Sequence, residues 1–432
     1  MIILALNCGS SSVKYKLYHW EKRQTLTKGM VERIGISGSF INFELPASNQ
    51  FGLLPVRKEQ KIDYDCPDHK TALKLIIETL THNEYGVVKA LAEISAVGHR
   101  VVHGGENFKS SVMINNEVLE AIRSVQDLAP LHNPPNIAGI EAAKEILPEV
   151  PHIAVFDTAF HQTMPESAFL YAVPYEWYGM YGVRRYGFHG TSHLYVSRRA
   201  AALLGKPPME TNLITMHIGN GVSITAIKGG ISVDTSMGLT PLEGAVMGTR
   251  SGDIDPAIIL FMIEKEGFYA EEIDSILNKK SGLLGITGKY MDRRDIEKAA
   301  AEGDRRAQLA IEIEAYRLRK YIGAYMAALG KVDAVIFTAG AGEMNWKLRE
   351  KVLEGMDGLG IKLDKNRNES AVSREKESTI SSDDSRIRVM VIPTDEEIVF
   401  IEDVVAILEG RYETHTHFTY SFENPKYKKK AE

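Results

Sequence analysis

Residues 2–18 place two apolar runs on either side of a short tip of small and polar residues. The runs 2–6 and 13–18 are predicted to form the two strands of a β-hairpin. The tip offers serine hydroxyls, an asparagine amide and closely spaced backbone N–H groups, and Lys14 follows it. Glycine at the tip lets the backbone approach a ligand, while aligned N–H groups and an ammonium group attract an anion. The hairpin is therefore a candidate phosphate-binding loop.

This loop differs from two familiar phosphate-binding loops. A Walker A loop ends in Gly-Lys-Ser/Thr and opens a helix, and the dinucleotide fingerprint is a Gly-x-Gly-x-x-Gly turn before a helix. Here the loop joins a strand to a strand. Residues 213–227 repeat the pattern of strand, glycine-bearing tip and strand, and a third glycine turn follows the apolar run 334–338. Either hairpin alone could be an ordinary turn, but two of them at the starts of two halves suggest a duplicated fold with a cleft between the halves.

Two motifs carry a resemblance to a known family. Residues 7–14, Asn-Cys-Gly-Ser-Ser-Ser-Val-Lys, resemble the amino-terminal motif of the acetate kinase family, and residues 234–253 resemble its longer second motif almost throughout. The likeness extends from residue 1 to about residue 408. It implies a duplicated actin-like (ribonuclease H-like) α/β fold, with two domains of mixed sheets flanked by helices and an interdomain cleft. It also implies reversible, Mg²⁺-dependent phosphoryl transfer between ATP and acetate, giving acetyl phosphate and ADP.

Composition sets the broad class. A chain of 432 residues is long for one core, so two domains are expected. A formal net charge of −6 gives no indication of nucleic-acid binding. Cys8 and Cys66 are the only cysteines, which argues against a disulfide scaffold and fits a reducing compartment. The apolar amino-terminal run is too short for a signal peptide or membrane span, so we expect a cytoplasmic enzyme with neither nucleic-acid nor membrane partners.

The predicted organisation follows the resemblance and the local patterns. We expect residues 1–157 and about 395–410 to form an acyl-side domain, residues 158–394 a nucleotide-binding domain, and residues 411–432 a polar basic tail that is disordered or packed on the surface. Apolar periodicity, with capping residues at the last two, predicts helices at residues 71–80, 118–125, 137–146, 305–329 and 395–408.

Two arginines are predicted to hold the reacting groups. Arg100 lies between apolar neighbours and a glycine turn, where a planar guanidinium suits a carboxylate or phosphate. The resemblance assigns to Arg100 and Arg250 the binding of acetate and of the transferring phosphoryl group. The two residues lie in different halves, so chemistry would require closure.

Three further residues match catalytic positions of the family. Asp157 ends an apolar strand, where an N-cap or a paired structural aspartate is the alternative to a functional role. The resemblance makes it the essential aspartate, which would orient substrate or metal because acetate is already deprotonated. His189 matches the histidine that donates to the phosphoryl group in the transition state, and His132 a second active-site histidine. We expect supporting or core roles for His99, His103, His161, His193 and His217.

The remaining site residues are also implied by the resemblance. The acyl pocket would be formed by Val102, Leu131, Phe188 and Pro241, and Arg100 would bind the carboxylate. Nucleotide and phosphate contacts would come from Ser10, Ser12, Lys14, His217, Gly219, Asn220, Gly221, Asp292, Arg294, Gly340, Gly342 and Glu343. The chain departs from the usual family residues at 289–291, Ala341 and Met344, which leaves the base site less supported than the phosphate and acyl sites.

Asn7 and Glu396 match the metal-site positions, where Mg²⁺, or Mn²⁺ in its place, would bind partly through water. Asp395 stands where the family usually has asparagine, which leaves the detail of this site open. The alternatives are a propionate- or butyrate-type kinase, an acetate kinase that uses another phosphoryl donor such as pyrophosphate, and a non-enzymatic nucleotide switch. By resemblance the chain is expected to be a homodimer.

Overall fold

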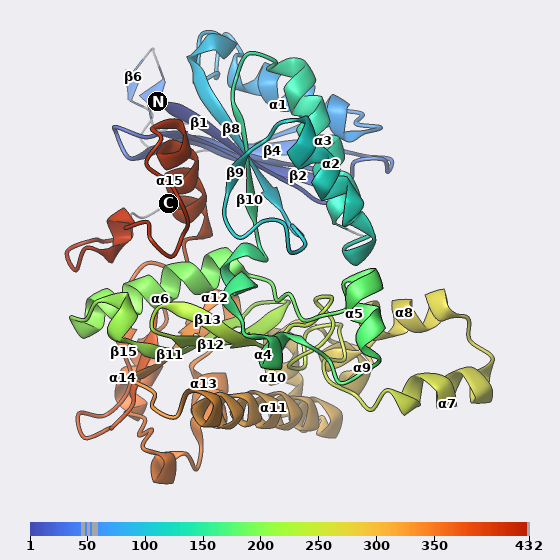
Figure 1. The fold of residues 1–432 in the computed structure, drawn as a ribbon, viewed down its shortest axis with the longest axis vertical. Coiled ribbons are helices and arrows are strands. Elements are labelled where there is room, and N and C mark those ends of the chain that lie inside the picture. Colours follow the sequence, from blue (N-terminus) through green and yellow to red (C-terminus); the bar gives the residue numbers. More distant parts are fainter. Residues whose placement is uncertain (45–47, 50–51, 54–58, 131, 430–432) are drawn as a thin grey trace. The chain divides into compact units, whose positions relative to one another are not determined.

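The computed structural model describes residues 1–44, 48–49, 52–53, 59–130 and 132–429 (Figure 1). The chain forms two compact units: unit 1 contains residues 1–159 and 396–419, and unit 2 contains residues 160–395 and 420–429. The chain therefore passes from one unit to the other after residues 159, 395 and 419. No helix among the described residues is long and apolar enough to cross a membrane.

Unit 1 is built on an eight-stranded mixed sheet. Strand β1 pairs antiparallel with β2 and parallel with β8, so the predicted amino-terminal hairpin lies in the middle of the sheet. In spatial order the strands are β7 (Glu59–Asp63), β4 (Phe40–Glu44), β3 (Gln24–Glu32), β2 (Ser12–His19), β1 (Ile2–Cys8), β8 (Ile94–Val101), β10 (His152–Phe156) and β9 (Val112–Met113), with the short pair β5 (Ser48–Asn49) and β6 (Gly52–Leu53) forming a separate ribbon.

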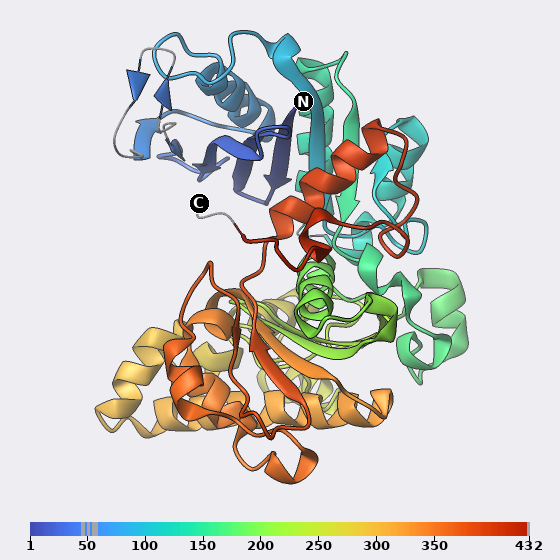
Figure 2. The ribbon, with the colours of Figure 1, turned by 90° about the vertical axis from the view of Figure 1, so that its left-hand side faces the viewer.

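Helices cover both faces of this sheet (Figure 2). One face packs against α1 (His69–Leu80), α2 (Asn116–Ser124) and α3 (Asn133–Ile146) through two clusters of buried apolar residues. The other face packs against α15 (Glu396–Leu408), whose Phe400 and Val404 contact alternate residues of the central strands, including Ile3. The face covered by α15 is the one that carries the predicted site residues Asn7, Lys14 and Arg100.

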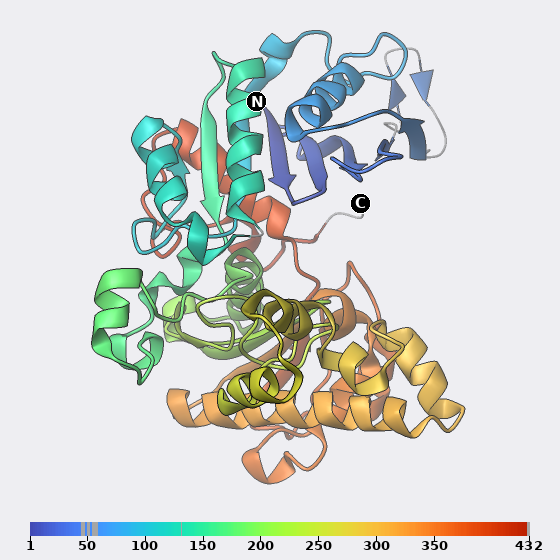
Figure 3. The same cartoon turned by 90° about the vertical axis from the view of Figure 1, so that its right-hand side faces the viewer.

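Unit 2 is built on a six-stranded mixed sheet, with the long helix α11 and the shorter α6 among its packing partners (Figure 3). The strands in order are β13 (Ile231–Thr235), β12 (Val222–Lys228), β11 (Asn212–Ile218), β14 (Ala334–Thr338), β16 (Arg388–Val391) and β15 (Ser378–Thr379). The helices are α4 (Glu166–Phe169), α5 (Tyr175–Tyr181), α6 (Gly190–Leu204), α7 (Ala257–Glu266), α8 (Ala270–Lys279), α9 (Gly282–Thr287), α10 (Arg293–Ala301), α11 (Arg305–Leu329), α12 (Ala339–Met344), α13 (Trp346–Leu353) and α14 (Lys365–Ser370).

The two units repeat one arrangement of strands. The order β3-β2-β1-β8-β10 in unit 1 corresponds to β13-β12-β11-β14-β16 in unit 2, with the same sequence of antiparallel and parallel pairs. The predicted duplicated fold with mixed, helix-flanked sheets is confirmed. The helix that follows the last strand of each unit packs in the other unit. Helix α15 follows the strands of unit 2 but packs in unit 1, and α6 follows β10 of unit 1 but packs in unit 2.

Local signals placed several helices well. Helix α11 has the predicted bounds because the Asp304 carboxylate accepts from the N–H groups of Arg306 and Ala307, and Gly330 ends it with a positive φ of 72°. Part of the segment 411–429 packs against unit 2. Tyr420 and Phe422 are buried, and the buried Arg199 guanidinium donates to the Phe422 carbonyl at 2.6 Å.

Candidate active site

Unit 1 gathers polar side chains on the sheet face that α15 covers. Side chains alternate between faces along a strand, so Arg100 of β8 shares a face with Gly98, where an added Cβ would strike the Phe400 ring of α15. Asp157 directly follows β10, and Asn7 is near the end of β1. Because β1, β8 and β10 are parallel neighbours, their carboxyl ends meet at one edge of the sheet. Three sequence-predicted residues from distant parts of the chain therefore lie together.

Arg100 and Asp157 form a two-pronged ion pair. The guanidinium donates from Nε to Oδ1 at 2.9 Å and from Nη2 to Oδ2 at 2.5 Å. The Asp157 side chain is only 3% exposed, whereas that of Arg100 is 32% exposed. The carboxylates of Asp157 and Glu396 raise the pKa of Arg100 above its ordinary value, so the guanidinium stays charged. Asp157 thus holds a cation whose exposed side can receive an anion.

The hairpin tip and the start of α15 add to the same face. In the β1–β2 ladder Lys14 stands directly opposite Asn7, and its side chain is exposed. The next lysine on this face, Lys16, is buried and pairs with Glu397 in the first turn of α15. Glu396, the first residue of that helix, is close enough to Arg100 to influence its pKa. Cationic and carboxylate groups therefore alternate around the end of β1.

The side chains of Asn7 and Glu396 suit a hard divalent cation. Both present oxygen donors from one unit and one sheet face, which is the chemistry that Mg²⁺ prefers. Among the described residues there is no cluster of three or more His, Cys, Asp or Glu side chains that could enclose a metal ion by themselves. A cation held by one or two protein oxygens, with water and phosphate completing its shell, fits this donor set.

Two buried asparagines that the sequence reasoning missed support this half of the site. Asn136 accepts from the Val102 N–H at 3.0 Å and donates to the Cys8 carbonyl at 2.6 Å, and so ties the chain directly after β8 to the hairpin. Asn133 bonds both backbone groups of His103. A signal was present, because Asn133 and Asn136 flank a Pro-Pro pair at a helix start directly after His132. Leu131 lies outside the described residues.

Unit 2 brings His189 and Arg250 to its own hairpin tip. A Cβ added at Gly221 would lie 3.5 Å from His189 Nε2 and 3.4 Å from Arg250 Nη1. Both groups therefore point to the same spot beside the tip, and any side chain at Gly221 would crowd them. His189 is a non-glycine residue in the left-handed region, with φ of 57°, immediately before α6. This uncommon conformation marks the residue as one that the surrounding fold holds in place.

The surroundings of Arg250 differ from those of Arg100. Its side-chain bonds in the described part of unit 2 go to the Pro241 carbonyl at 3.2 Å and to the Met247 sulfur, and no carboxylate of that part pairs with it. Burial lowers the pKa of Arg250, which means that its charge is incompletely compensated. An anionic ligand would supply the missing compensation.

The loop that carries Arg250 is folded back on itself. Gly248 packs so closely on the hairpin that an added Cβ would lie 2.2 Å from the Asn220 side-chain oxygen. The Gly244 N–H donates to Asp253 at 2.8 Å, and Arg185 donates to Glu243 at 2.6 Å. These contacts explain why the 234–253 motif is rich in glycine and carboxylates, and they hold Pro241 and Arg250 on one rigid segment.

Histidines fill the space behind His189. Its ring stacks on that of His217 with centroids 4.0 Å apart, and the His217 Nδ1 contacts Ser192 Oγ at 2.8 Å. His161 is buried and contacts the carbonyl of Phe188, the acyl-pocket candidate, at 3.0 Å. His193 lies deeper in the same cluster.

The nucleotide-side candidates are only partly gathered. Asp292 caps α10 by accepting from the Arg294 N–H, and Arg294 also pairs with its side chain, which lowers the pKa of Asp292 to about 2. Gly340 has open space where a side chain would be. Glu343 is buried and accepts from the Thr394 N–H at 3.0 Å, so it braces the chain before α15, and burial raises its pKa.

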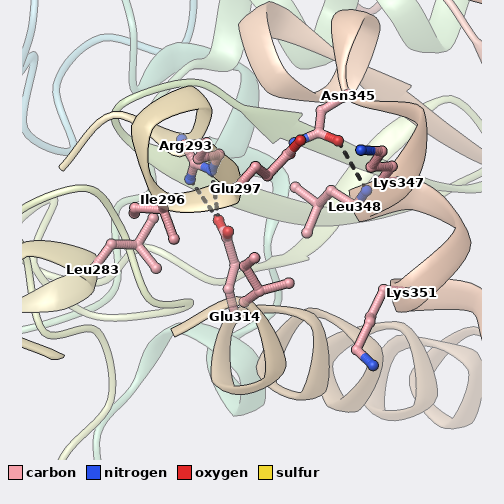
Figure 4. A pocket seen from close by; sticks show the side chains of 10 residues that line it. Leu283, Arg293, Ile296, Glu297, Glu314, Asn345, Lys347, Leu348 and Lys351 are labelled. Carbon is pink, nitrogen blue, oxygen red and sulfur yellow. Dashed lines mark hydrogen bonds and ion pairs between the residues drawn. The ribbon is translucent and has the colours of Figure 1, made fainter. Parts of the chain in front are cut away.

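A cavity of about 170 Å³ lies between α10, α11 and α13 (Figure 4). Arg293 donates to Glu314 inside it and also to the Gly219 carbonyl of the hairpin at 2.7 Å. The Asn345 side chain, directly before α13, donates a hydrogen bond to Glu297 of α10. The cavity thus adjoins two segments that carry nucleotide-site candidates, the hairpin at Gly219 and the start of α10. Its lining comprises Leu283, Arg293, Ile296, Glu297, Ile311, Glu314, Asn345, Lys347, Leu348 and Lys351.

Comparison with known proteins shows the family of the chain. The model of the Acetokinase family matches residues 2–402. The acetate kinases of Geobacter metallireducens and Geobacter sulfurreducens are each 66% identical over 422 residues, which are 98% of this chain and 98% of theirs. The crystal structure of Porphyromonas gingivalis acetate kinase is 47% identical, has a TM-score of 0.88 and covers 94% of this chain and 99% of its own. A propionate kinase from Francisella tularensis is 42% identical, with a TM-score of 0.83 and coverage of 93% and 98%. The chain belongs to the acetokinase family.

Proposed function

We propose that this chain catalyses the reversible, in-line transfer of the γ-phosphoryl group of ATP to acetate, giving acetyl phosphate and ADP. The observation that carries the proposal is that each unit has a guanidinium near the carboxyl end of its central strands. Arg100 is aimed by Asp157, and Arg250 meets His189 beside Gly221. A nucleotide switch needs the hairpins but not these two arginines.

The chemistry consists of bringing two anions together and stabilising the charge that spreads over the transferring group. Arg100 binds the carboxylate, which is already deprotonated, so no general base is needed. Asp157 acts by orienting Arg100 through its two-pronged ion pair. Lys14, Arg250 and the His189 N–H then contact oxygens of the phosphoryl group, as charged or polar donors that cost no reorganisation when the charge develops. His132, directly before α3, would act as the second active-site histidine.

Asn7 and Glu396 would hold Mg²⁺, in part through water, and Mn²⁺ would substitute for it. Bound there, the metal would neutralise part of the charge on the phosphates during transfer. Asp395, which precedes Glu396, adds a carboxylate beside this site. The exposed Ser10 and the half-buried Ser12 of the first hairpin, together with the Gly219–Gly221 tip of the second, would provide hydroxyl and N–H groups for the phosphates.

The acyl pocket would be formed by Val102, Leu131, Phe188 and Pro241, which are all apolar. A pocket sized for one methyl group discriminates against each added methylene by only about 1–3 kcal/mol. We therefore expect propionate to be a poorer but measurable acceptor.

For the donor, we propose that the base enters the cavity of Figure 4. The cavity lies between α10, which begins after Asp292, and α13, which follows the Gly340–Gly342 turn. Asp292 and Arg294 at the start of α10 would then be near the ribose. Glu343 would act by holding Thr394 and so the start of α15.

Hydroxylamine trapping of acyl phosphate tests the function directly. The purified chain is incubated with Mg²⁺ and ATP together with acetate, propionate, butyrate or no acid, and hydroxamate is measured. The proposal predicts strong product with acetate and a steep fall by butyrate. A parallel series with GTP and pyrophosphate in place of ATP tests the donor, and no product with acetate and any donor would contradict the proposal.

We further propose a cytoplasmic homodimer. Both cysteines are free and buried, as expected of a protein in a reducing compartment. Unit 2 exposes large apolar side chains on two helices, which is a cost unless another surface covers them. They are Tyr175, Trp177, Met180 and Tyr181 of α5, and Ile258, Leu260 and Phe261 of α7. Sedimentation should give a dimer that Leu260→Asp weakens, whereas a monomeric parent chain would contradict the assignment.

A further inference from the structure

Behind His189, hydrogen bonds continue into the core of unit 2. His189 Nδ1 lies 2.9 Å from Ser223 Oγ, and the same hydroxyl lies 2.7 Å from His193 Nε2. On its other side, His193 Nδ1 lies 2.7 Å from Thr215 Oγ1. Thr215, Ser223 and His193 are completely buried. Four side chains from α6, β11, β12 and the turn before α6 thus form one continuous line.

Thr215, the residue at the end of this line farthest from His189, determines which group donates in each hydrogen bond. Among the described residues, the Thr215 hydroxyl has a single hydrogen-bond partner, His193 Nδ1. A fully buried hydroxyl hydrogen without an acceptor is costly, so Thr215 donates to His193 Nδ1. If the line ran the other way, His193 would donate to Thr215 and the hydroxyl hydrogen would have no acceptor.

The remaining protons follow from this direction. Burial places the pKa of His193 well below its ordinary value, so the ring is neutral and carries one N–H. Because Nδ1 accepts from Thr215, that N–H is at Nε2 and donates to Ser223 Oγ. The single Ser223 hydrogen is then directed to His189 Nδ1. His189 accepts at Nδ1, and its own proton lies on Nε2.

We propose that Thr215, His193 and Ser223 are positioning residues that fix His189 as the tautomer protonated at Nε2. The inference rests on the proposed role of His189 in phosphoryl transfer. Its functional meaning comes from the geometry at Gly221, where the Nε2 edge and Arg250 Nη1 face the same spot. The fixed tautomer places an N–H, rather than a lone pair, beside the arginine that receives the phosphoryl group. The opposite tautomer would direct a lone pair at an anion.

The first test is spectroscopic. In the intact chain with ¹⁵N-labelled histidine, long-range ¹H–¹⁵N correlations distinguish the two neutral tautomers, and His189→Gln identifies the relevant ring. We expect wild-type His189 to be the Nε2-protonated tautomer. Finding the Nδ1-protonated tautomer would overturn the proposal. The spectrum is recorded without substrates, so this result does not depend on whether acetate is the acceptor.

The chain offers a matched pair of variants for the second test. Thr215 and Thr225 are directly opposed in the β11–β12 ladder, and both are fully buried, but Thr225 bonds Thr235 instead of a histidine. Thr215→Val should release the tautomer of His189 and lower kcat about ten- to a hundredfold, by analogy with residues that orient metal-ligating histidines, with KM for acetate little changed. Thr225→Val should leave the tautomer and the kcat unchanged.

Two further variants separate positioning from folding. Thr215→Ser keeps the hydroxyl and should restore the tautomer and most of the turnover lost in Thr215→Val. Ser223→Ala removes the bond to His189 itself and should produce a mixture of tautomers. If Thr215→Val and Thr225→Val have the same kcat and the same His189 spectrum, or if Ser223→Ala retains a pure Nε2 tautomer, the proposal is wrong.

Discussion

The two hairpins of the molecule have the same place in the fold and opposite chemistry. In each ladder we compare the residue pair one step before the last pair at the tip. This pair is Asn7 opposite Lys14 in unit 1, and His217 opposite Ser223 in unit 2. In unit 1 an ammonium group follows the tip. In unit 2 the corresponding position is a serine that bonds His189.

The difference extends to the neighbouring strands. Unit 1 surrounds its hairpin with ions in pairs, Arg100 with Asp157 and Lys16 with Glu397. Unit 2 surrounds its hairpin with uncharged hydrogen-bonding groups and two arginines: Arg293, which pairs with Glu314, and Arg250, which no carboxylate in the described part of the unit balances. A duplicated backbone can thus supply charge from one half and oriented neutral donors from the other, which is the division of labour that phosphoryl transfer between anions requires.

The largest expected effect is the loss of turnover when either of the two arginines, Arg250 or Arg100, is replaced. Arg250→Ala should retain the fold and nucleotide binding and lose roughly 10²–10³ in kcat, because it removes one donor to the developing charge. The exposed Arg305→Ala is the matched control and should have normal turnover. Near-normal turnover in Arg250→Ala, measured by hydroxamate formation, would remove Arg250 from the reaction centre.

Arg100→Ala should lose turnover to a similar extent but should also lose stability. It leaves the buried Asp157 carboxylate without its partner, which costs about 3–5 kcal/mol for buried pairs, whereas Arg250→Ala leaves no such carboxylate. The double variant Arg100→Ala, Asp157→Ala should recover part of the stability and none of the activity. Equal urea midpoints for the two single arginine variants would contradict the paired-ion description of unit 1.

Lys14→Ser makes the first hairpin resemble the second. We expect weaker binding of ATP by about ten- to a hundredfold, because a charge-assisted contact worth roughly 1.5–3 kcal/mol is lost. The exposed Lys22→Ser serves as control. ATP titration followed by calorimetry measures the change, and an unaltered affinity would mean that the ammonium group has no role at the phosphates.

These contrasts also show what the sequence could predict. The hairpins, the helix Arg305–Leu329 and the duplicated fold could be predicted because glycine tips, caps and periodicity are local signals. The Arg100–Asp157 pair and the cluster behind His189 join residues far apart in the chain, and only the strand order brings them together. Asn133, Asn136, Thr215 and Ser223 were missed because a buried polar residue is indistinguishable from an exposed one until its neighbours are known.

Acid should destabilise both units through buried neutral histidines. Burial lowers the pKa of His99 in unit 1 and of His193 in unit 2, so near pH 6 the unfolded chain binds more protons than the folded one. The contribution of each neutral histidine to the free energy of unfolding is therefore fully present above the histidine pKa of the unfolded chain, about 6.5. Below that pH it falls by about 1.4 kcal/mol per pH unit for each histidine. Urea unfolding at pH 7.5 and 5.5 measures the loss. His193→Gln should reduce it, and a pH-independent midpoint would contradict buried neutral rings.

The smallest expected effect is at the start of α10. Asp292→Ala removes the helix cap and should cost about 0.5–2 kcal/mol of stability. Because the pKa of Asp292 is lowered to about 2, the cap's contribution in the parent chain is present above about pH 3.8 and lost as pH falls through 2. Asp292→Asn, which keeps a capping side chain, is the control. If Asp292→Ala also raises KM for ATP while Asp292→Asn does not, the carboxylate contacts the nucleotide as well.

The most direct test of the division between the charged and the neutral half is the pH profile of kcat for the parent chain, His189→Gln and His189→Ala. A neutral donor at Nε2 can be replaced in part by the Gln side-chain N–H. The account predicts that His189→Gln retains more turnover than His189→Ala and that the parent profile does not fall above pH 6.5. A parent kcat that falls tenfold per pH unit above a pKa absent from His189→Gln would show that the histidine acts as a cation and would contradict the account.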